Sequence, residues 1–167
     1  EGRGESFGIK EPISIISGTF GKAFGSGGAF LATDKITGKD LIQNCGAFRY
    51  TTALAPSICA SALAALNLIK NNPNWGSKLQ EESIALRDKL SQIGWQRPLG
   101  EGPIISIILG SDELAMTYQK KMEEQGLLTI AIRPPTVPEG ESRLRIIIRR
   151  NTPVESFERL IKVLRIN

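Results

Sequence analysis

The residue with the clearest chemical potential is Lys22, which lies in the segment Thr19-Phe-Gly-Lys-Ala-Phe-Gly-Ser-Gly-Gly28. The surrounding glycines leave the amine open to approach, and their backbone N–H groups can come close to a phosphate. The hydroxyl of Thr19 can donate a hydrogen bond to the same phosphate. A lysine that forms a Schiff base needs such an open site with a phosphate anchor. A surface turn that contains one lysine fits the spacing equally well.

Two other phosphate-binding motifs do not fit this segment. A Walker A loop requires the pattern GxxxxGK[ST], whereas Gly18 lies too near Gly21 and Ala23 replaces the hydroxyl residue. Gly25-Ser-Gly27 is a poor dinucleotide fingerprint, because a strand rather than a helix is predicted after it.

A second group of candidate residues lies far along the chain. Arg133–Gly140 contains three prolines and predicts a rigid loop, which includes Thr136. The next segment, Ser142–Arg150, alternates apolar and basic residues, so it predicts a strand with Arg143 and Arg145 on one face. Four arginines occur between positions 143 and 150, and a solvated or nucleic-acid-facing patch is the alternative interpretation of them.

Composition sets the broad class. The chain has 167 residues, 41% of them hydrophobic and 23% charged, as in an ordinary globular protein. It contains no histidine, which excludes a histidine-based triad and a histidine metal site within it. No apolar run approaches the roughly 20 residues of a membrane helix, and the first residues do not form a signal peptide. Cys45 and Cys59 have no ligand spacing, so we expect a cytoplasmic protein without disulfides.

The first half predicts alternating strands and helices. We expect strands at Ile13–Ser17 and Gly28–Thr33, the second of them buried. A short helix is predicted over Thr37–Cys45, ended by Gly46, followed by an extended Phe48–Thr52. Pro56 then begins an Ala/Leu-rich helix that runs to Lys70.

The polar segment Asn71-Asn-Pro-Asn74 predicts a domain boundary, giving domains 1–72 and 73–167. The second half predicts a small α+β domain with an antiparallel sheet. Its expected elements are helices at 78–93 and 112–125, strands at 104–109, 127–132 and 142–150, and a last helix that buries Val154, Phe157, Leu160, Ile161 and Leu164. Thr152-Pro-Val-Glu155 predicts a capping box before that helix.

The Lys22 segment closely resembles the cofactor-lysine segment of α-oxoamine synthases, where T-[FL]-[GS]-K precedes a glycine-rich run. The resemblance implies an α/β fold of the type I class that uses pyridoxal 5′-phosphate (PLP). It implies that Lys22 carries PLP and that Thr19 holds its phosphate. Residues 1–72 would then be the last part of the large cofactor domain, and residues 73–167 the small C-terminal domain.

Phe48-Arg-Tyr-Thr-Thr52 resembles the segment of this family that crosses to the neighbouring subunit of a homodimer. There a hydroxyl residue reaches the phosphate of the partner's cofactor. The resemblance makes Thr51 and Thr52 candidates for this role without choosing between them. A threonine-rich strand end before a helix is the alternative, since such segments are common.

Ala131-Ile-Arg-Pro-Pro-Thr-Val-Pro138, followed by Arg143-Leu-Arg145, resembles one branch of the family. That branch condenses L-alanine with a pimeloyl thioester, and the match implies that Thr136 contacts substrate and Arg145 clamps the amino-acid carboxylate. A planar guanidinium suits that task. The resemblance implies no nucleic-acid or membrane partner. Sister enzymes that use glycine or serine with other acyl-CoA donors are the nearest alternative.

Two departures from the family pattern affect the expected activity. A histidine usually follows the Arg-Leu-Arg strand, but Arg149-Arg-Asn-Thr152 stands at that place. Family members are also more than twice as long, and their first half supplies the aspartate and histidines around the cofactor ring. We therefore expect this polypeptide alone to bind PLP weakly and to be inactive. A non-catalytic half that assembles with a separate N-terminal partner is a further alternative.

Overall fold

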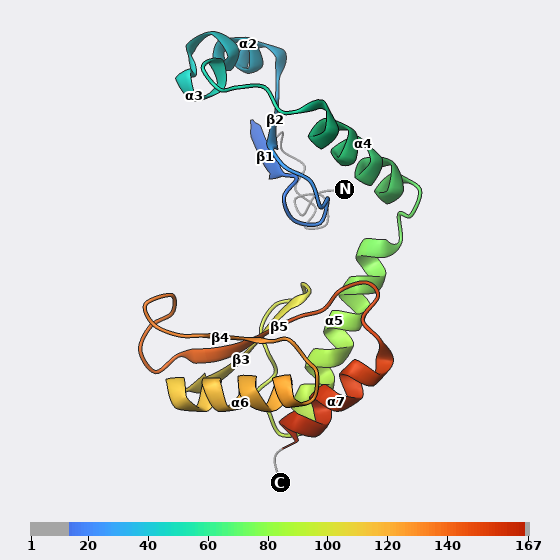
Figure 1. The fold of residues 1–167 in the computed structure, drawn as a ribbon, viewed down its shortest axis with the longest axis vertical. Coiled ribbons are helices and arrows are strands. Elements are labelled where there is room, and N and C mark those ends of the chain that lie inside the picture. Colours follow the sequence, from blue (N-terminus) through green and yellow to red (C-terminus); the bar gives the residue numbers. More distant parts are fainter. Residues whose placement is uncertain (1–13, 166–167) are drawn as a thin grey trace. The chain divides into compact units, whose positions relative to one another are not determined.

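The computed structural model describes residues 14–165, and the chain divides into two compact units, with the boundary between Asn72 and Pro73. The division falls within the polar segment Asn71–Asn74. Each unit has its own strands and helices (Figure 1). Within residues 14–165, none of the helices combines the length and apolar composition that crossing a bilayer requires.

The first unit contains a β-hairpin and three helices. Strands β1 (Ile15–Thr19) and β2 (Ala29–Thr33) pair antiparallel, with Ser17 opposite Leu31. The helices are α2 (Lys35–Asn44), α3 (Gly46–Arg49) and α4 (Pro56–Lys70), so the predicted helix from Pro56 to Lys70 is confirmed. Proline suits the start of α4 because its missing N–H has no partner in the first helical turn.

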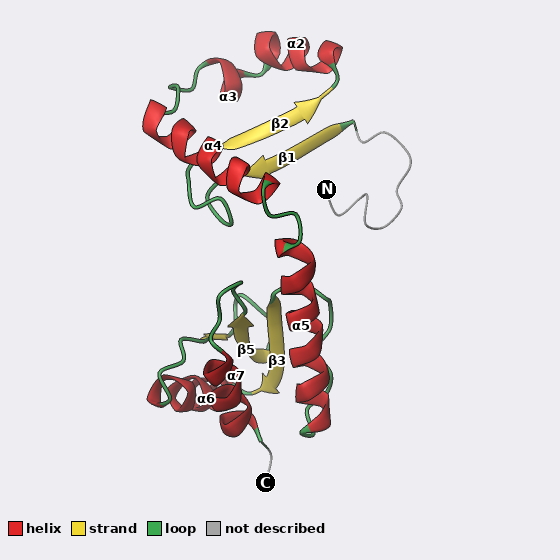
Figure 2. Cartoon of the chain, turned by 90° about the vertical axis from the view of Figure 1, so that its right-hand side faces the viewer, coloured by secondary structure: helices red, strands yellow, loops and turns green. Residues whose placement is uncertain are grey.

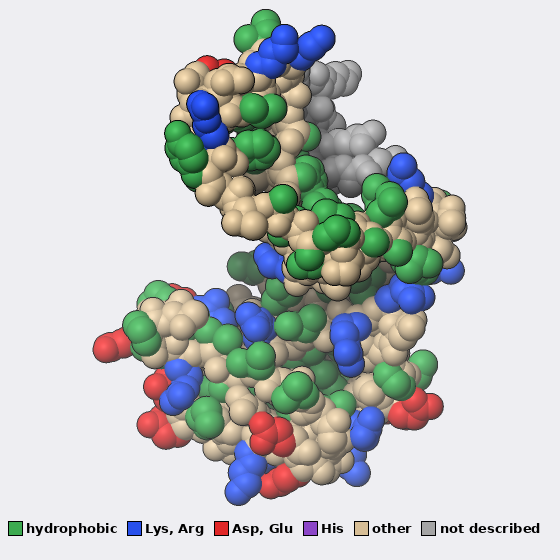
Figure 3. Space-filling view, turned by 45° about the horizontal axis from the view of Figure 1, so that its top comes forward, with side chains coloured by type: hydrophobic (Ala, Val, Ile, Leu, Met, Phe, Trp, Pro, Cys, Tyr) green, Lys and Arg blue, Asp and Glu red, His purple; other side chains and the backbone are tan. Residues whose placement is uncertain are grey.

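The hairpin strands are exposed. The prediction that Gly28–Thr33 is a buried strand is therefore correct in the strand and wrong in the burial, since Phe30 is 42% exposed and Leu31 48% exposed. None of the described residues of this unit is buried, and green hydrophobic side chains are spread over its surface in Figure 3. Two strands without a covering layer cannot exclude water from their side chains.

The segment before α4 is partly helical, which contradicts the extended structure predicted for Phe48–Thr52. The N–H groups of Arg49 and Tyr50 donate to the carbonyls of Cys45 and Gly46, at 2.9 and 3.0 Å. These local helical bonds prevail over the strand preference of aromatic and threonine side chains. The helix predicted over Thr37–Cys45 is confirmed as α2, which ends at Asn44, and Gly46 begins the separate helix α3.

Asp34 caps α2, and its titration is predicted to control the first turn. The hydroxyl of Thr37 and the backbone N–H groups of Thr37 and Ile36 donate to its carboxylate, which holds the pKa of Asp34 below its ordinary value of 3.8. Because the pKa is lowered in the folded state, the cap is present above pH 3.8 and is lost as pH falls through the lowered value. We expect the protection of the Ile36 and Thr37 amides, which is the intrinsic exchange rate at each pH divided by the rate measured by NMR, to fall as this happens. Asp34→Asn, which retains an acceptor but cannot titrate, should remove the pH dependence; an unchanged pH profile would contradict the cap.

The second unit is the predicted antiparallel α+β domain. Its elements are α5 (Trp75–Gln92), β3 (Ile104–Gly110), α6 (Asp112–Glu124), β4 (Ile130–Ile132), β5 (Ser142–Ile147) and α7 (Val154–Leu164). The strand order is β3-β5-β4, and both pairings are antiparallel. Strand β4 is shorter than predicted because the Leu127 N–H still donates to the Met122 carbonyl at the end of α6.

One face of this sheet is covered by helices. Helix α6 packs against all three strands and α5 packs against β3, as Figures 1 and 2 show. The core contains Leu90 from α5, Ile105 and Ile107 from β3, and Leu144 from β5. The alternation predicted along β5 is confirmed, because Leu144, Ile146 and Ile148 are buried.

Two details of α7 differ from the sequence prediction. The capping box does not form, because the Thr152 hydroxyl donates to the Arg149 carbonyl and accepts from the Arg149 N–H. Pro153 is the N-cap and makes no side-chain capping bond. Val154 is 69% exposed rather than buried, whereas Leu160 and Leu164 belong to the core as predicted.

Candidate functional site

Lys22 lies in the loop that joins the two strands of the hairpin. The Phe20 N–H donates to the Gly28 carbonyl, and the Ser26 N–H donates to the Phe20 carbonyl, both at 2.9 Å. Within this loop, the Gly25 N–H donates to the Lys22 carbonyl at 2.9 Å, which closes a tight turn. Lys22 is exposed, and it forms no ion pair within residues 14–165. The hairpin therefore holds the backbone at Lys22 while leaving its amine open.

The glycines of this loop have two different structural roles. Gly28 adopts φ +86°, and a Cβ added there would lie 2.4 Å from Leu54 Cδ1, so only glycine allows this approach to the segment before α4. Ser26 fixes the loop to α4 itself, since its hydroxyl donates to the Ile58 carbonyl at 2.8 Å. A Cβ at Gly25 would meet nothing within 4 Å, so the loop is open on the side nearer to Lys22.

The three candidate threonines of the first unit occupy two segments. Thr19 is the last residue of β1, opposite Ala29, so it belongs to the same hairpin as Lys22. Thr51 and Thr52 lie between α3 and α4. All three are exposed, and in the described part of the chain their hydroxyls make no hydrogen bond. Their hydroxyls are thus free to contact a ligand or another subunit.

Arg145 lies at the centre of the second unit's sheet, on the face opposite the core. In the β-sheet register its neighbours are Ser106 of β3 and Ile130 of β4. The Arg145 Nε is buried and has no hydrogen-bond partner among the described residues. A buried donor without a partner is costly, so the Nε of Arg145 is a donor that the described chain leaves unsatisfied.

The neighbouring arginines are bound differently from Arg145. Arg143 donates from Nε to the Glu141 carbonyl at 3.0 Å and from Nη2 to the Glu141 carboxylate at 2.8 Å. Arg150 lies after β5, with its Cζ 4.0 Å from the ring centroid of Trp75. The four arginines therefore do not form one uniform basic patch, and Arg145 differs from the others by its unpaired buried Nε.

Thr136 lies in the loop between β4 and β5. It is exposed, and its N–H donates to the Arg133 carbonyl at 3.0 Å. The peptide bond between Pro134 and Pro135 is cis. Thr136 and Arg145 belong to the second unit and Lys22 to the first, so the structure describes the two parts of the predicted site separately.

Sequence analysis missed several residues that shape these sites. Glu141 distinguishes Arg143 from Arg145, Ser106 lies opposite Arg145, and Ser26 fixes the Lys22 loop to α4. Ser106 and Ser26 contact residues that are distant from them in sequence. Glu141 lies only two residues before Arg143, and this spacing was the one signal in the sequence that could have indicated its ion pair.

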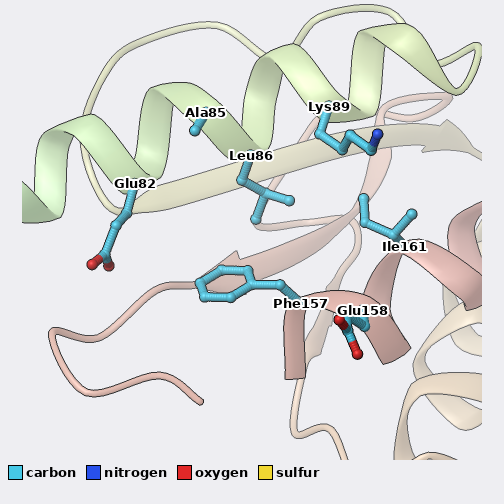
Figure 4. Close-up of a pocket in the computed structure, with 7 residues that line it drawn as sticks. All are labelled: Glu82, Ala85, Leu86, Lys89, Phe157, Glu158 and Ile161. Atoms are coloured by element: carbon cyan, nitrogen blue, oxygen red, sulfur yellow. The ribbon is translucent and has the colours of Figure 1, made fainter. Parts of the chain in front are cut away.

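Other parts of the described chain offer no better candidate. A groove of about 380 Å³ lies between α5 and α7, with a floor of Leu86, Phe157 and Ile161 (Figure 4). It contains none of the predicted site residues. Residues 14–165 contain no cluster of acidic or cysteine side chains that could hold a metal ion.

Comparisons with known proteins all indicate one protein family. A model of aminotransferase class I and II matches residues 4–164. The 8-amino-7-oxononanoate synthase of Lysinibacillus sphaericus is 38% identical over 160 residues, which are 96% of this chain and 41% of that protein. The chain therefore spans less than half the length of the curated relatives it matches.

Solved structures show the same fold. The 8-amino-7-oxononanoate synthase of Francisella tularensis has a TM-score of 0.78 and 26% identity, over 90% of this chain and 44% of that one. The serine palmitoyltransferase (SPT) of Sphingomonas wittichii has a TM-score of 0.88 and 24% identity, over 98% and 42%. A related SPT structure contains PLP.

Proposed function

The chain belongs to the aminotransferase class I and II family, and on that basis we propose that it is part of a PLP-dependent 8-amino-7-oxononanoate synthase. Its likeness to solved structures confirms the predicted type I fold. The proposed reaction joins L-alanine to a pimeloyl thioester, with release of CO2 and the thiol carrier, in biotin biosynthesis. The curated relatives at 38 and 39% identity carry that enzyme's name.

The observation that carries the proposal is the buried, unpaired Nε of Arg145. The reaction needs a group that binds the carboxylate of the amino acid, and a guanidinium can bind both carboxylate oxygens. Arg145 lies on the sheet face opposite the core and is only partly buried, so such a ligand can approach the outer nitrogens of its guanidinium. Arg143, whose Nε and Nη2 both bind Glu141, is less suited to this task.

The Lys22 hairpin fits the proposed cofactor. The amine of Lys22 and the hydroxyl of Thr19 are both exposed, and the loop is open at Gly25. Lys22 would carry PLP, Thr19 would donate to its phosphate, and Thr51 or Thr52 would donate to the phosphate in the neighbouring subunit of a homodimer. When bound, PLP supplies a ring that accepts the electrons of the substrate carbanion.

Residues of this chain would perform the remaining steps. Arg145 would hold the alanine carboxylate and so orient the bonds around its Cα, with Thr136 as an additional substrate contact. The Lys22 amine, which would be released when the amine of alanine takes its place, would accept the proton from that Cα. The active sites would lie at the interface of the homodimer.

The cofactor assignment is tested by labelling. The chain, joined to the part of the fold that its relatives possess, is incubated with PLP, and the visible absorption band of lysine-bound cofactor is recorded. Borohydride reduction followed by peptide mapping should place the label on Lys22. A label on another lysine, or no label, would overturn the proposal. The 167-residue chain alone should show little of the band and no condensation product.

Substitution of Arg145 tests the carboxylate site. In the complete enzyme, we expect Arg145→Gln to raise the KM for alanine by about 10- to 100-fold, since a charged hydrogen bond contributes about 1.5–3 kcal/mol. Arg149→Gln is the matched control, because Arg149 is exposed and lies beyond β5. Steady-state kinetics with varied alanine measure both variants. Equal KM values for wild type and Arg145→Gln would remove Arg145 from the site.

A further inference from the structure

A cavity of about 280 Å³ lies on the open face of the second unit's sheet. One wall is the loop of residues 95–99, which follows α5, and the floor is the outward face of β3. The apolar lining includes Trp95, Leu99, Ile104 and Ile108, and the polar lining includes Ser106 and Arg143. Trp95 is held in place by its indole N–H, which donates to the Leu164 carbonyl at 2.6 Å.

This cavity adjoins Arg145. Ser106, one of its lining residues, lies directly opposite Arg145 in the antiparallel pairing of β3 and β5, and Ile108 lies opposite Arg143. Residues opposite each other in such a pair share a face, with Cα atoms about 5 Å apart. A ligand held by Arg145 can therefore continue along the sheet into the cavity.

The polar end of the cavity contains two arginines. Arg97 and Arg143 line it, and no acidic residue is among its lining residues in the described chain. Arg97 binds Asp88 through Nε at 2.7 Å, and Arg143 binds Glu141 through Nε and Nη2. The Nη1 group of each arginine makes no hydrogen bond within residues 14–165. Both guanidiniums are thus held in place with N–H groups left to donate.

We propose that this cavity binds an unbranched acyl chain that ends in a carboxylate, and that Arg143 selects for that carboxylate. Isoleucine, leucine and tryptophan side chains would cover the methylene groups, and Arg143 would donate to the terminal carboxylate. The volume lies at the small end of ligand pockets, which suits a short chain rather than a long fatty acyl group. This assignment rests on the proposed function, because it makes the cavity the site of the second substrate's tail.

Trp95 supplies a direct measurement of binding. The chain has two tryptophans, Trp75 and Trp95, so Trp75→Phe leaves Trp95 as the single fluorophore. The full chain with this change is titrated with the monoamide of pimelic acid, whose amide end represents the thioester. Heptanamide, with the same chain length and no carboxylate, is the matched probe. We expect the monoamide to change Trp95 emission and to bind at least about tenfold more tightly than heptanamide.

Two variants separate the charge from the apolar wall. Arg143→Gln should weaken monoamide binding by about tenfold and leave heptanamide binding unchanged. Ile108→Phe, at a position that is 55% exposed, should fill the cavity and abolish the response to both probes without disturbing the core, and it adds no second fluorophore. Circular dichroism checks that each variant is folded. Equal affinity for the two probes, or an unchanged preference in Arg143→Gln, would overturn the assignment.

The outcome is independent of the cofactor experiment. If Lys22 is labelled by PLP but Trp95 does not discriminate between the probes, the cavity assignment fails and the proposed function stands. If Trp95 discriminates but the label is absent from Lys22, the proposed function fails, and with it the role of this cavity in an acyl transfer.

Discussion

Replacing Lys22 by alanine is expected to lower kcat/KM of the complete enzyme by at least about 10³-fold. Proton transfer by a positioned side chain contributes about 10²–10⁴-fold, and the variant also loses the residue that carries the cofactor. The structure supports the assignment because the hairpin presents Lys22 on an exposed turn. Measurement of condensation product under saturating PLP gives the effect on the reaction.

Two controls make this prediction specific. Lys35→Ala removes another exposed lysine of the same unit, at the start of α2, and should leave activity unchanged. Lys22→Arg retains the positive charge but cannot form the bond to PLP, so it should be as inactive as Lys22→Ala. If Lys22→Ala keeps more than about one tenth of the wild-type kcat/KM, a general base contributing the usual factor cannot be Lys22.

Replacing Arg87 by methionine is expected to reduce the free energy of unfolding of the second unit by about 2–4 kcal/mol. Arg87 is 1% exposed. Its Nη1 donates to the Ser83 carbonyl at 3.0 Å, its Nη2 to the Ile104 carbonyl at 2.9 Å, and its Nε to the Leu99 carbonyl at 3.3 Å. Burial lowers the pKa of the guanidinium from its ordinary value, with a further contribution from Arg97.

The cost arises because methionine removes three donors at once. The carbonyls of Leu99 and Ile104 would then lack their side-chain donor in a region that water reaches poorly, while methionine fills most of the same volume. Since Arg87 connects α5 to the loop before β3, we also expect faster amide exchange in residues 97–104 of the variant. Arg87→Lys should recover only part of the stability, because an ammonium cannot reach all three carbonyls.

Urea unfolding monitored by tryptophan fluorescence measures this effect. The matched control is Arg97→Met, because the Arg97–Asp88 ion pair is exposed and should contribute no more than about 1 kcal/mol. If the two variants have the same midpoint and slope, the buried hydrogen bonds of Arg87 do not stabilise the unit. A change in the slope without a change in the midpoint would indicate a change in the unfolded state instead.

Local patterns in the sequence predicted most of the elements. The alternation along 142–150 predicted β5 and its two faces, and the spacing of apolar residues predicted α5 and α6. Glycines at 94 and 126 follow these helices with positive φ, as helix ends commonly require. These features depend on neighbours a few residues apart, so a short stretch of sequence contains the information that specifies them.

Local sequence patterns gave wrong predictions where two hydrogen-bonding patterns compete, and where burial depends on a covering layer of other elements. The helical turn at Gly46–Arg49 replaced a predicted extended segment, and the Thr152 hydroxyl bonded Arg149 instead of forming a capping box. The strand at Ala29–Thr33 is apolar but exposed, because no layer of the described unit covers it. The conformational preferences of single residues do not show which of two local hydrogen-bonding patterns is more stable. They also do not show whether another layer of the fold covers a strand.

The sequence by itself determined the chemistry that this chain offers: a lysine in a glycine-rich turn, hydroxyls beside it, and arginines along a strand. Only the tertiary structure decided which arginine keeps an Nε without a partner. Arg143 and Arg145 alternate on the same face and have the same chemistry, but Glu141 binds one of them while the other keeps a buried Nε without a partner. The tertiary structure likewise buried Arg87 and placed Ser106 opposite Arg145. Burial and pairing depend on residues distant in sequence, whose approach only the folded chain establishes.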